Sequence, residues 1–180
     1  MALAQFRGRA VLIIATNALL GLPPVAVGLV LYLLLSHNGP FGFLRLLYTP
    51  AAMVLAQAAL ATPIIAALTH RVLEHSWAEF GPPLRVFGAT RIRALPVLLG
   101  MNRRAIATAL LAGFGRTISE IGAVLLVGGN IAGHTRTMTT SIALQTSMGN
   151  LEFALALGCV LIGISLAVST CLILLGASRP

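Results

Sequence analysis

The feature that most constrains this chain is a series of long apolar runs. The first covers residues 10–35, twenty-six residues without a charged side chain. A helix needs about 20 apolar residues to cross the hydrocarbon core of a bilayer. Hydrophobic residues make up 58% of the chain and charged residues only 9%, whereas a soluble domain carries about 25% charged residues. The sequence therefore predicts an integral membrane protein and excludes a soluble enzyme, a disordered chain and a disulfide scaffold.

The runs predict an all-α, polytopic membrane protein that forms one transmembrane domain over residues 1–180. About four transmembrane helices are expected, at about 10–35, 46–69, 105–127 and 153–177. Pro23 and Pro24 should kink or break the first span, because proline removes a helical hydrogen bond. The run Gly128-Gly129-Asn130 should end the third span.

Two longer segments connect these spans. Residues 70–104 form a polar, basic loop that is punctuated by Gly81-Pro82-Pro83. Within the segment 128–152, the Thr- and Ser-rich stretch 135–150 is short for a span, so we expect a peripheral or re-entrant helix there.

The distribution of arginine predicts the orientation. Cytoplasmic segments of membrane proteins carry an excess of Lys and Arg. With the N-terminus inside, the inner segments hold nine arginines and the outer segments hold only Arg45 and Arg136. The segment 70–104 is then cytoplasmic and the segment 128–152 is external. The net charge of +8 needs no nucleic-acid partner.

Arg116 and Glu120 stand out because both lie inside an expected span. Ionisable residues within a span are costly in lipid and suggest a functional site. Their i, i+4 spacing puts them on one helix face, where they can pair. Thr117 and Ser119 add polar groups nearby. Two interpretations stay open: an ion pair that holds helices together, or a water-filled pathway in which Arg116 favours anions.

The basic loop is ambiguous on its pattern alone. Leu84, Phe87, Leu95 and Leu98 fall near one face of a helix, and Pro96 should end that helix. The segment could be a solvated loop held inside by its charge, or a docking helix for a cytoplasmic partner.

Other chemistry finds little support. The four histidines are divided between the two sides of the membrane, so no metal site is expected. The chain has no Asp for a Ser-His-Asp triad and no G-x-x-x-x-G-K loop, so we expect no catalytic residue and no ATP hydrolysis by this chain. Cys159 and Cys171 are expected to face lipid or to pack.

The run Gly113-Phe-Gly-Arg-Thr-Ile-Ser-Glu-Ile-Gly-Ala123, followed by Gly128-Gly-Asn-Ile131 and Thr135-Arg-Thr137, resembles the permease subunits of oxyanion ABC importers. The likeness is closest to tungstate permeases, with molybdate and sulfate permeases as near relatives. It extends upstream through Gly21-Leu-Pro-Pro-Val25 and Leu47-Tyr-Thr-Pro50 and downstream to Gly158, so it covers most of the chain.

The resemblance implies a fold and a set of partners. The fold is a helical bundle of the type I ABC importer permease in a bacterial or archaeal cytoplasmic membrane. The chain would form a homodimer in membrane lipid, with an ATP-binding cassette subunit on the cytoplasmic face and an external oxyanion-binding protein. The chain would bind no cofactor, because the partner subunit uses the ATP. It would also bind no nucleic acid.

The resemblance also suggests the site residues. Arg116, Thr117, Ser119, Glu120 and Asn130 would line the translocation pathway or its gate. The loop 70–104 would hold the coupling helix that contacts the ATPase. Such permeases carry Glu-Ala-Ala, three residues and then Gly in this helix; aligned on Gly88, this chain reads Pro82-Pro83-Leu84 and keeps the glycine. The residues expected to couple to the ATPase are Arg85, Gly88, Ala89, Arg91 and Arg93.

One departure concerns the N-terminus. Members of the family normally begin with another span before the turn matched here by Phe6-Arg-Gly-Arg9. We therefore expect a further span upstream in the full protein, because the start site was assigned too late or because this chain is a fragment. The remaining alternative is a variant that works with four spans. The alternative functions to tungstate import are those of a molybdate or sulfate permease, or of a non-transporting membrane scaffold or truncated fragment.

Overall fold

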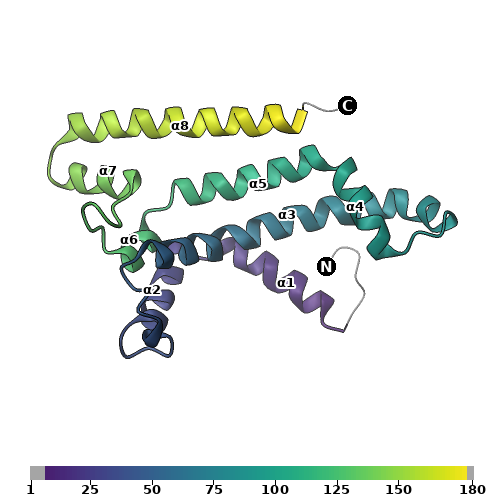
Figure 1. Cartoon of the computed structure of the whole chain (residues 1–180), viewed down its shortest axis with the longest axis horizontal. Coiled ribbons are helices and arrows are strands. Elements are labelled where there is room, and N and C mark those ends of the chain that lie inside the picture. Colours follow the sequence, from purple (N-terminus) through teal and green to yellow (C-terminus); the bar gives the residue numbers. More distant parts are fainter. Residues whose placement is uncertain (1–6, 178–180) are drawn as a thin grey trace. The chain divides into compact units, whose positions relative to one another are not determined.

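The computed structural model describes residues 7–177, and within this range the chain is helical with no strand. Two short 3₁₀ turns, Leu19–Gly21 and Gly42–Leu44, accompany the α-helices. In chain order (Figure 1) the helices are α1 (Arg9–Ala18), α2 (Pro24–Leu35), α3 (Pro50–Val86), α4 (Arg91–Met101), α5 (Arg103–Ile118), α6 (Gly122–Gly128), α7 (Met138–Ser147) and α8 (Leu151–Ala177). The predicted all-α class is confirmed.

The helices are long and apolar enough for between two and four membrane spans. Among the described residues, α3 and α8 each meet this test alone. The pairs α1–α2 and α4–α5 meet it only if each bent pair counts as one span, and α4 and α5 meet at 78°. The break before α2 falls at Pro23 and Pro24, and Pro24 opens the helix at its first position, where the missing N–H costs nothing.

The helix bounds differ from the expected spans in two places. Helix α3 continues far beyond residue 69, to Val86, so most of the basic loop is helical. The expected span 105–127 is divided, because α5 ends at Ile118 and α6 begins only at Gly122. Helix α7 is ten residues long, too short to cross a bilayer, and the paired side-chain and backbone hydrogen bonds of Thr137 and Thr140 cap its start.

The chain divides into two compact units. One contains residues 7–21, 62–113 and 170–177, and the other contains residues 22–61 and 114–169. In the second unit, α2, the first turns of α3, and α6 share a core of Leu35, Ala52, Met53, Ala56, Leu60, Ala123, Val124 and Val127. Gly28 allows α2 to approach α6 closely, because a Cβ atom there would lie 2.6 Å from Cα of Ala123.

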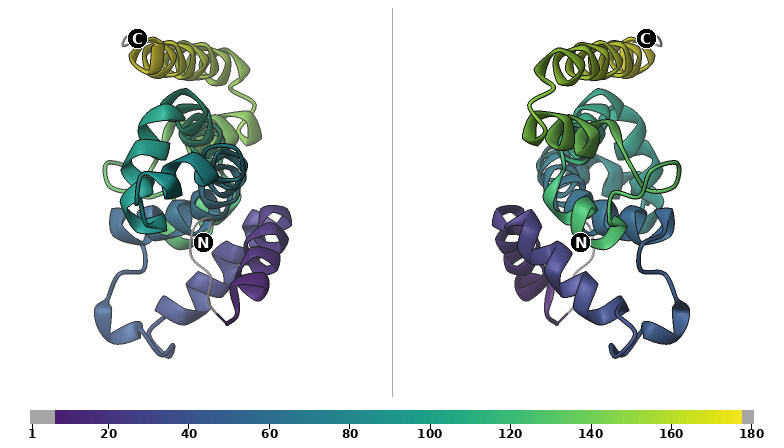
Figure 2. Two further views of the ribbon diagram at one scale, coloured as in Figure 1. Left: turned by 90° about the vertical axis from the view of Figure 1, so that its right-hand side faces the viewer. Right: turned by 90° about the vertical axis from the view of Figure 1, so that its left-hand side faces the viewer.

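The first unit has a smaller core, in which α4 packs against the end of α3. Leu73, Ala94 and Leu98 are buried together, and Trp77, Phe80 and Leu84 pack around them. In the left view of Figure 2, α4 and the end of α3 face the viewer. This core fixes the turn that joins the two helices.

The apolar stripe of Leu84, Phe87, Leu95 and Leu98 does not lie on one helix. Helix α3 ends at Val86 and α4 begins at Arg91. Leu84 and Leu98 do pack in the same core, whereas Phe87 lies in the turn with 87% of its surface exposed. The period-3.6 pattern across residues 84–98 thus comes from two helices that fold against each other.

The prolines here do not end helices as expected. Pro82 and Pro83 lie inside α3, and Pro96 lies inside α4, which continues to Met101. A proline frees the carbonyl four residues earlier. For Pro96 this carbonyl belongs to Ile92, which is 83% exposed, so it can be solvated. Pro82 and Pro83 free the carbonyls of Ala78 and Glu79, two residues that are also exposed.

Candidate functional site

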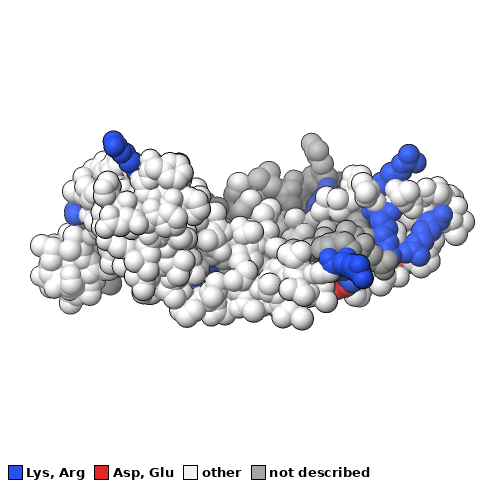
Figure 3. All heavy atoms as spheres, turned by 90° about the horizontal axis from the view of Figure 1, so that it is seen from below, with Lys and Arg blue, Asp and Glu red and all other residues white. Residues whose placement is uncertain are grey.

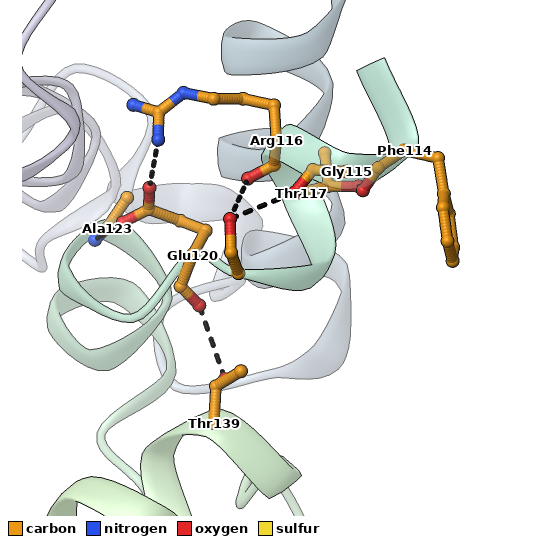
Figure 4. Close-up of polar contacts among 8 residues, drawn as sticks. Phe114, Gly115, Arg116, Thr117, Glu120, Ala123 and Thr139 are labelled. Atoms are coloured by element: carbon orange, nitrogen blue, oxygen red, sulfur yellow. Dashed lines mark hydrogen bonds and ion pairs between the residues drawn. The ribbon is translucent and has the colours of Figure 1, made fainter. Parts of the chain in front are cut away.

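The centre of the candidate site is the ion pair between Arg116 and Glu120. Arg116 lies in the last turn of α5, and Glu120 lies in the break between α5 and α6. A guanidinium nitrogen of Arg116 lies 3.4 Å from Oε2 of Glu120. The i, i+4 pairing expected from the sequence is therefore present, although the helix ends between the two residues. Figure 4 shows the two side chains turned toward each other.

Glu120 also holds the neighbouring elements. Its side chain is buried, with 4% of its surface exposed. Oε1 accepts a hydrogen bond of 3.0 Å from the backbone N–H of Ala123, in the first turn of α6, where a carboxylate is favoured by the helix dipole. Its backbone carbonyl accepts a hydrogen bond of 3.3 Å from the Thr139 hydroxyl of α7. Glu120 therefore ties α5, α6 and α7 together, so the helix-holding interpretation of the pair is part of the structure.

Arg116 is placed differently, because 33% of its side chain is exposed. A guanidinium carries five N–H donors, and the contact with Glu120 engages one of its nitrogens. A partly exposed guanidinium can bind an oxyanion by charge-assisted hydrogen bonds. The pair can thus combine both functions, with Glu120 fixing the position of a cation that remains accessible.

The neighbouring hydroxyls bind to the backbone. Thr117 donates to the carbonyl of Phe114 at 2.9 Å. Ser119 lies within hydrogen-bonding distance of the carbonyls of Gly115, at 2.9 Å, and Arg116, at 3.3 Å. The carbonyls of Gly115 and Arg116 are among the last four of α5, which have no helical partner. Thr117 and Ser119 lie beside the ion pair as expected, but their hydroxyl protons point to the helix.

Asn130 belongs to a different cluster. It follows Gly129, the left-handed residue that ends α6 as expected, and is itself left-handed with φ 50°. Its side-chain oxygen accepts a hydrogen bond of 3.3 Å from Nε of Arg136, and its carbonyl accepts another from the same guanidinium. The structure pairs Asn130 with Arg136, while Arg116 pairs with Glu120. Sequence reasoning missed the contribution of Thr139, for which the only signal was the Thr-rich stretch.

The second candidate surface is the turn between α3 and α4. Gly88 has φ 74°, a left-handed conformation that glycine adopts without strain. The N–H of Gly88 bonds to the carbonyl of Arg85, and the N–H of Ala89 bonds to that of Leu84. This is the Schellman arrangement that ends a helix. Thr90 then begins α4 by accepting a hydrogen bond from the N–H of Arg93.

The turn carries both apolar and basic side chains outward. Val86, Phe87 and Ile92 expose 85%, 87% and 83% of their surfaces. Arg85 and Arg93 are exposed and Arg91 is half-buried. Figure 3 shows arginines gathered on one part of the surface. An exposed apolar patch with a charged rim is typical of a protein interface.

No cluster of three or more metal-ligating side chains occurs among residues 7–177. Both cysteines are exposed and unpaired. The two surfaces thus offer an accessible cation and a turn with exposed apolar and basic side chains.

Comparison with known proteins identifies the family, although no family model matches the chain. The chain is 42% identical to the tungstate uptake system permease protein of Peptoclostridium acidaminophilum, over 84% of this chain and 67% of that protein. The chain belongs to the permease subunits of oxyanion ABC transporters. A probable anion ABC transporter permease of Haloferax volcanii is 38% identical over 92% of this chain and 73% of its own. A tungstate permease of Campylobacter jejuni is 33% identical, over 92% and 69%.

Permeases of sulfate and molybdenum transport systems match at lower identity, 29% for a sulfate permease of Salmonella typhimurium and 32% for a molybdenum permease of Azotobacter vinelandii. A permease of this family is a multi-pass protein of the cell membrane. It works with an ATPase subunit and a binding protein, and ABC permeases do not themselves hydrolyse ATP. The predicted family and membrane location are confirmed.

Proposed function

We propose that this permease imports tungstate into the cytoplasm. Two tungstate permeases from different organisms are 42% and 33% identical to it, and the sulfate and molybdenum permeases are 29% and 32% identical. The observation that carries the proposal is a cation suited to an oxyanion: Arg116 is held by a buried carboxylate and keeps a third of its side chain exposed.

The proposed pathway passes the face of Arg116. Its positive charge lowers the barrier for an anion that has left water. Glu120 keeps the guanidinium in one position and, through Ala123 and Thr139, joins that position to α6 and α7. A movement of these helices during the transport cycle would then move the cation. Thr117 and Ser119 border the pathway, and Asn130 shapes the turn after α6 that contributes to its gate.

The proposed ATPase contact is the turn between α3 and α4. Phe87 and its apolar neighbours would enter a groove of the ATPase, and Arg85, Arg91 and Arg93 would meet acidic groups at its rim. Gly88 and Ala89 give the turn its shape through the hydrogen bonds that end α3. A rigid turn can transmit a displacement of the ATPase to α3 and α4, because both helices pack in one core.

The assembly that we propose contains two copies of the permease in membrane lipid, two ATPase subunits and one external binding protein. An apolar groove of about 330 Å³, lined by Leu22, Ala26, Val27, Val30, Leu31 and Ala59, supports contact with lipid or a second copy. The permease would bind no cofactor of its own, and ATP would be used by the partner subunit. Alternating access would follow the ATP-driven closure of the ATPases.

Reconstitution tests the cargo. The complete transporter is placed in vesicles with its binding protein, and ATP hydrolysis is measured with tungstate, molybdate or sulfate. We expect stimulation at the lowest concentration with tungstate. Stimulation by molybdate or sulfate alone would identify that oxyanion as the transported substrate. No stimulation by any oxyanion would contradict the proposed import function.

A further inference from the structure

The single tryptophan of the chain lies beside the turn between α3 and α4. Trp77 belongs to α3, about two and a half turns before its end at Val86. The guanidinium carbon of Arg85 lies 5.1 Å from the centre of its ring, and that of Arg91 lies 5.6 Å from it. Both distances are within the range of cation–π attraction, for which tryptophan is the strongest aromatic partner. One ring therefore holds an arginine from each side of the turn.

The ring is itself held flat against α3. Gly81 lies one turn after Trp77, and a Cβ atom at Gly81 would lie 3.0 Å from two atoms of the ring. A side chain at position 81 would therefore press on the indole. The ring also packs against Leu73, Ala94 and Leu98, the core that joins α3 and α4. The position of the ring is thus set by both helices.

We infer that Trp77 is a positioning residue for ATPase docking, and that it acts by orienting Arg85 and Arg91. The inference rests on the proposed docking role of the turn. A free arginine side chain loses rotamer entropy when it binds. An arginine already stacked on a ring loses less, so the ring raises the affinity for the ATPase without touching it. A merely structural tryptophan would hold α3 against α4 but would have no coupling to the arginines.

A double-mutant cycle separates these roles. The tagged full-length permease carries Trp77→Leu, Arg91→Gln or both, and the affinity for the purified ATPase subunit is measured in detergent. We expect Trp77→Leu to weaken binding about tenfold and Trp77→Phe about threefold, because phenylalanine keeps a smaller π-face. The double variant should lose less affinity than the product of the two single losses, because Trp77 can then act only through Arg85.

The control is Phe80→Leu, which removes an aromatic ring from the same core and should leave the affinity unchanged. If the loss of affinity in the double variant equals the product of the two single losses, the inference is overturned. A loss of affinity in Phe80→Leu as large as that in Trp77→Leu would also overturn it. If Trp77→Leu fails to insert in the membrane, the cycle is run with Trp77→Phe, for which native affinity would be the contrary result. Unchanged binding in Arg91→Gln combined with Arg93→Gln would instead contradict the docking proposal itself.

Discussion

Glu120 lies 3.4 Å from the guanidinium of Arg116, and the two residues differ sharply in exposure. The carboxylate is buried and also bonds to the N–H of Ala123, whereas the cation is one-third exposed. The hydrogen bond from Ala123 offsets part of the cost of burying the carboxylate, which then holds the accessible cation in place. The relationship makes Arg116 the residue to examine for anion passage and Glu120 the residue to examine for stability.

Replacing Arg116 by alanine should lower oxyanion transport at least tenfold and leave the permease in the membrane. The charge that favours the anion is lost, while Glu120 keeps its bond to Ala123. Arg116→Lys should keep part of the activity, because it retains the charge but not the fork of donors. Uptake and the amount of membrane protein are measured together. Disappearance of the protein from the membrane would assign Arg116 to folding instead.

Replacing Glu120 by alanine should destabilise the purified permease by about 1–3 kcal/mol. The N–H of Ala123 at the start of α6 would lose its acceptor, and Arg116 would lose its partner. Glu120→Gln should lose less, because its amide oxygen can still accept from Ala123. The midpoint of thermal unfolding gives the comparison. Glu152 is exposed in the first turn of α8, and Glu152→Ala serves as the control. Equal midpoints for the alanine variants would refute a structural role for Glu120.

Gly28→Ala should weaken the packing of α2 on α6. The new Cβ would lie 2.6 Å from backbone Cα of Ala123, so the helices must move apart, and overpacking of this kind costs about 1–3 kcal/mol. Gly163→Ala in α8 is the matched control, because open space surrounds that position. Detergent stability of both variants is measured. A Gly28→Ala protein as stable as the Gly163→Ala protein would show that α2 and α6 are not in close contact.

Reversing the charges at Arg91 and Arg93 to Glu should release the ATPase subunit and abolish ATP-driven uptake. The basic rim of the turn would then repel the acidic groups that we expect on the partner. Capture of the ATPase by tagged permease measures the effect, and Arg45→Glu, outside the turn, is the control. Full capture and uptake in the double variant would contradict docking at this turn.

Sequence patterns predicted some of this structure well. The i, i+4 rule anticipated the pairing of Arg116 with Glu120, and Pro23-Pro24 marked the break before α2. These features follow from local geometry. The fold-back of α4 on α3 was missed because the residues that pack there, such as Leu84 and Leu98, share a helical period that one straight helix would also produce. The continuation through Pro96 was missed because it depends on the exposure of Ile92, which the sequence does not reveal.

The candidate site was predicted in part. Arg116, Thr117, Ser119 and Glu120 lie in one short stretch, so their proximity was evident. The bond from Thr139 to Glu120 joins residues nineteen positions apart and depends on how α7 folds back. Asn130 was expected in the pathway, but its partner in the structure is Arg136.

The most direct test of the account is the tungsten content of cells at low external tungstate. Cells that lack the gene are compared with cells that carry the native gene or its Arg116→Ala variant. We predict that loss of the gene lowers cellular tungsten at least tenfold, that sulfur content is unchanged, and that only the native gene restores tungsten. Equal tungsten in all three strains would contradict the account.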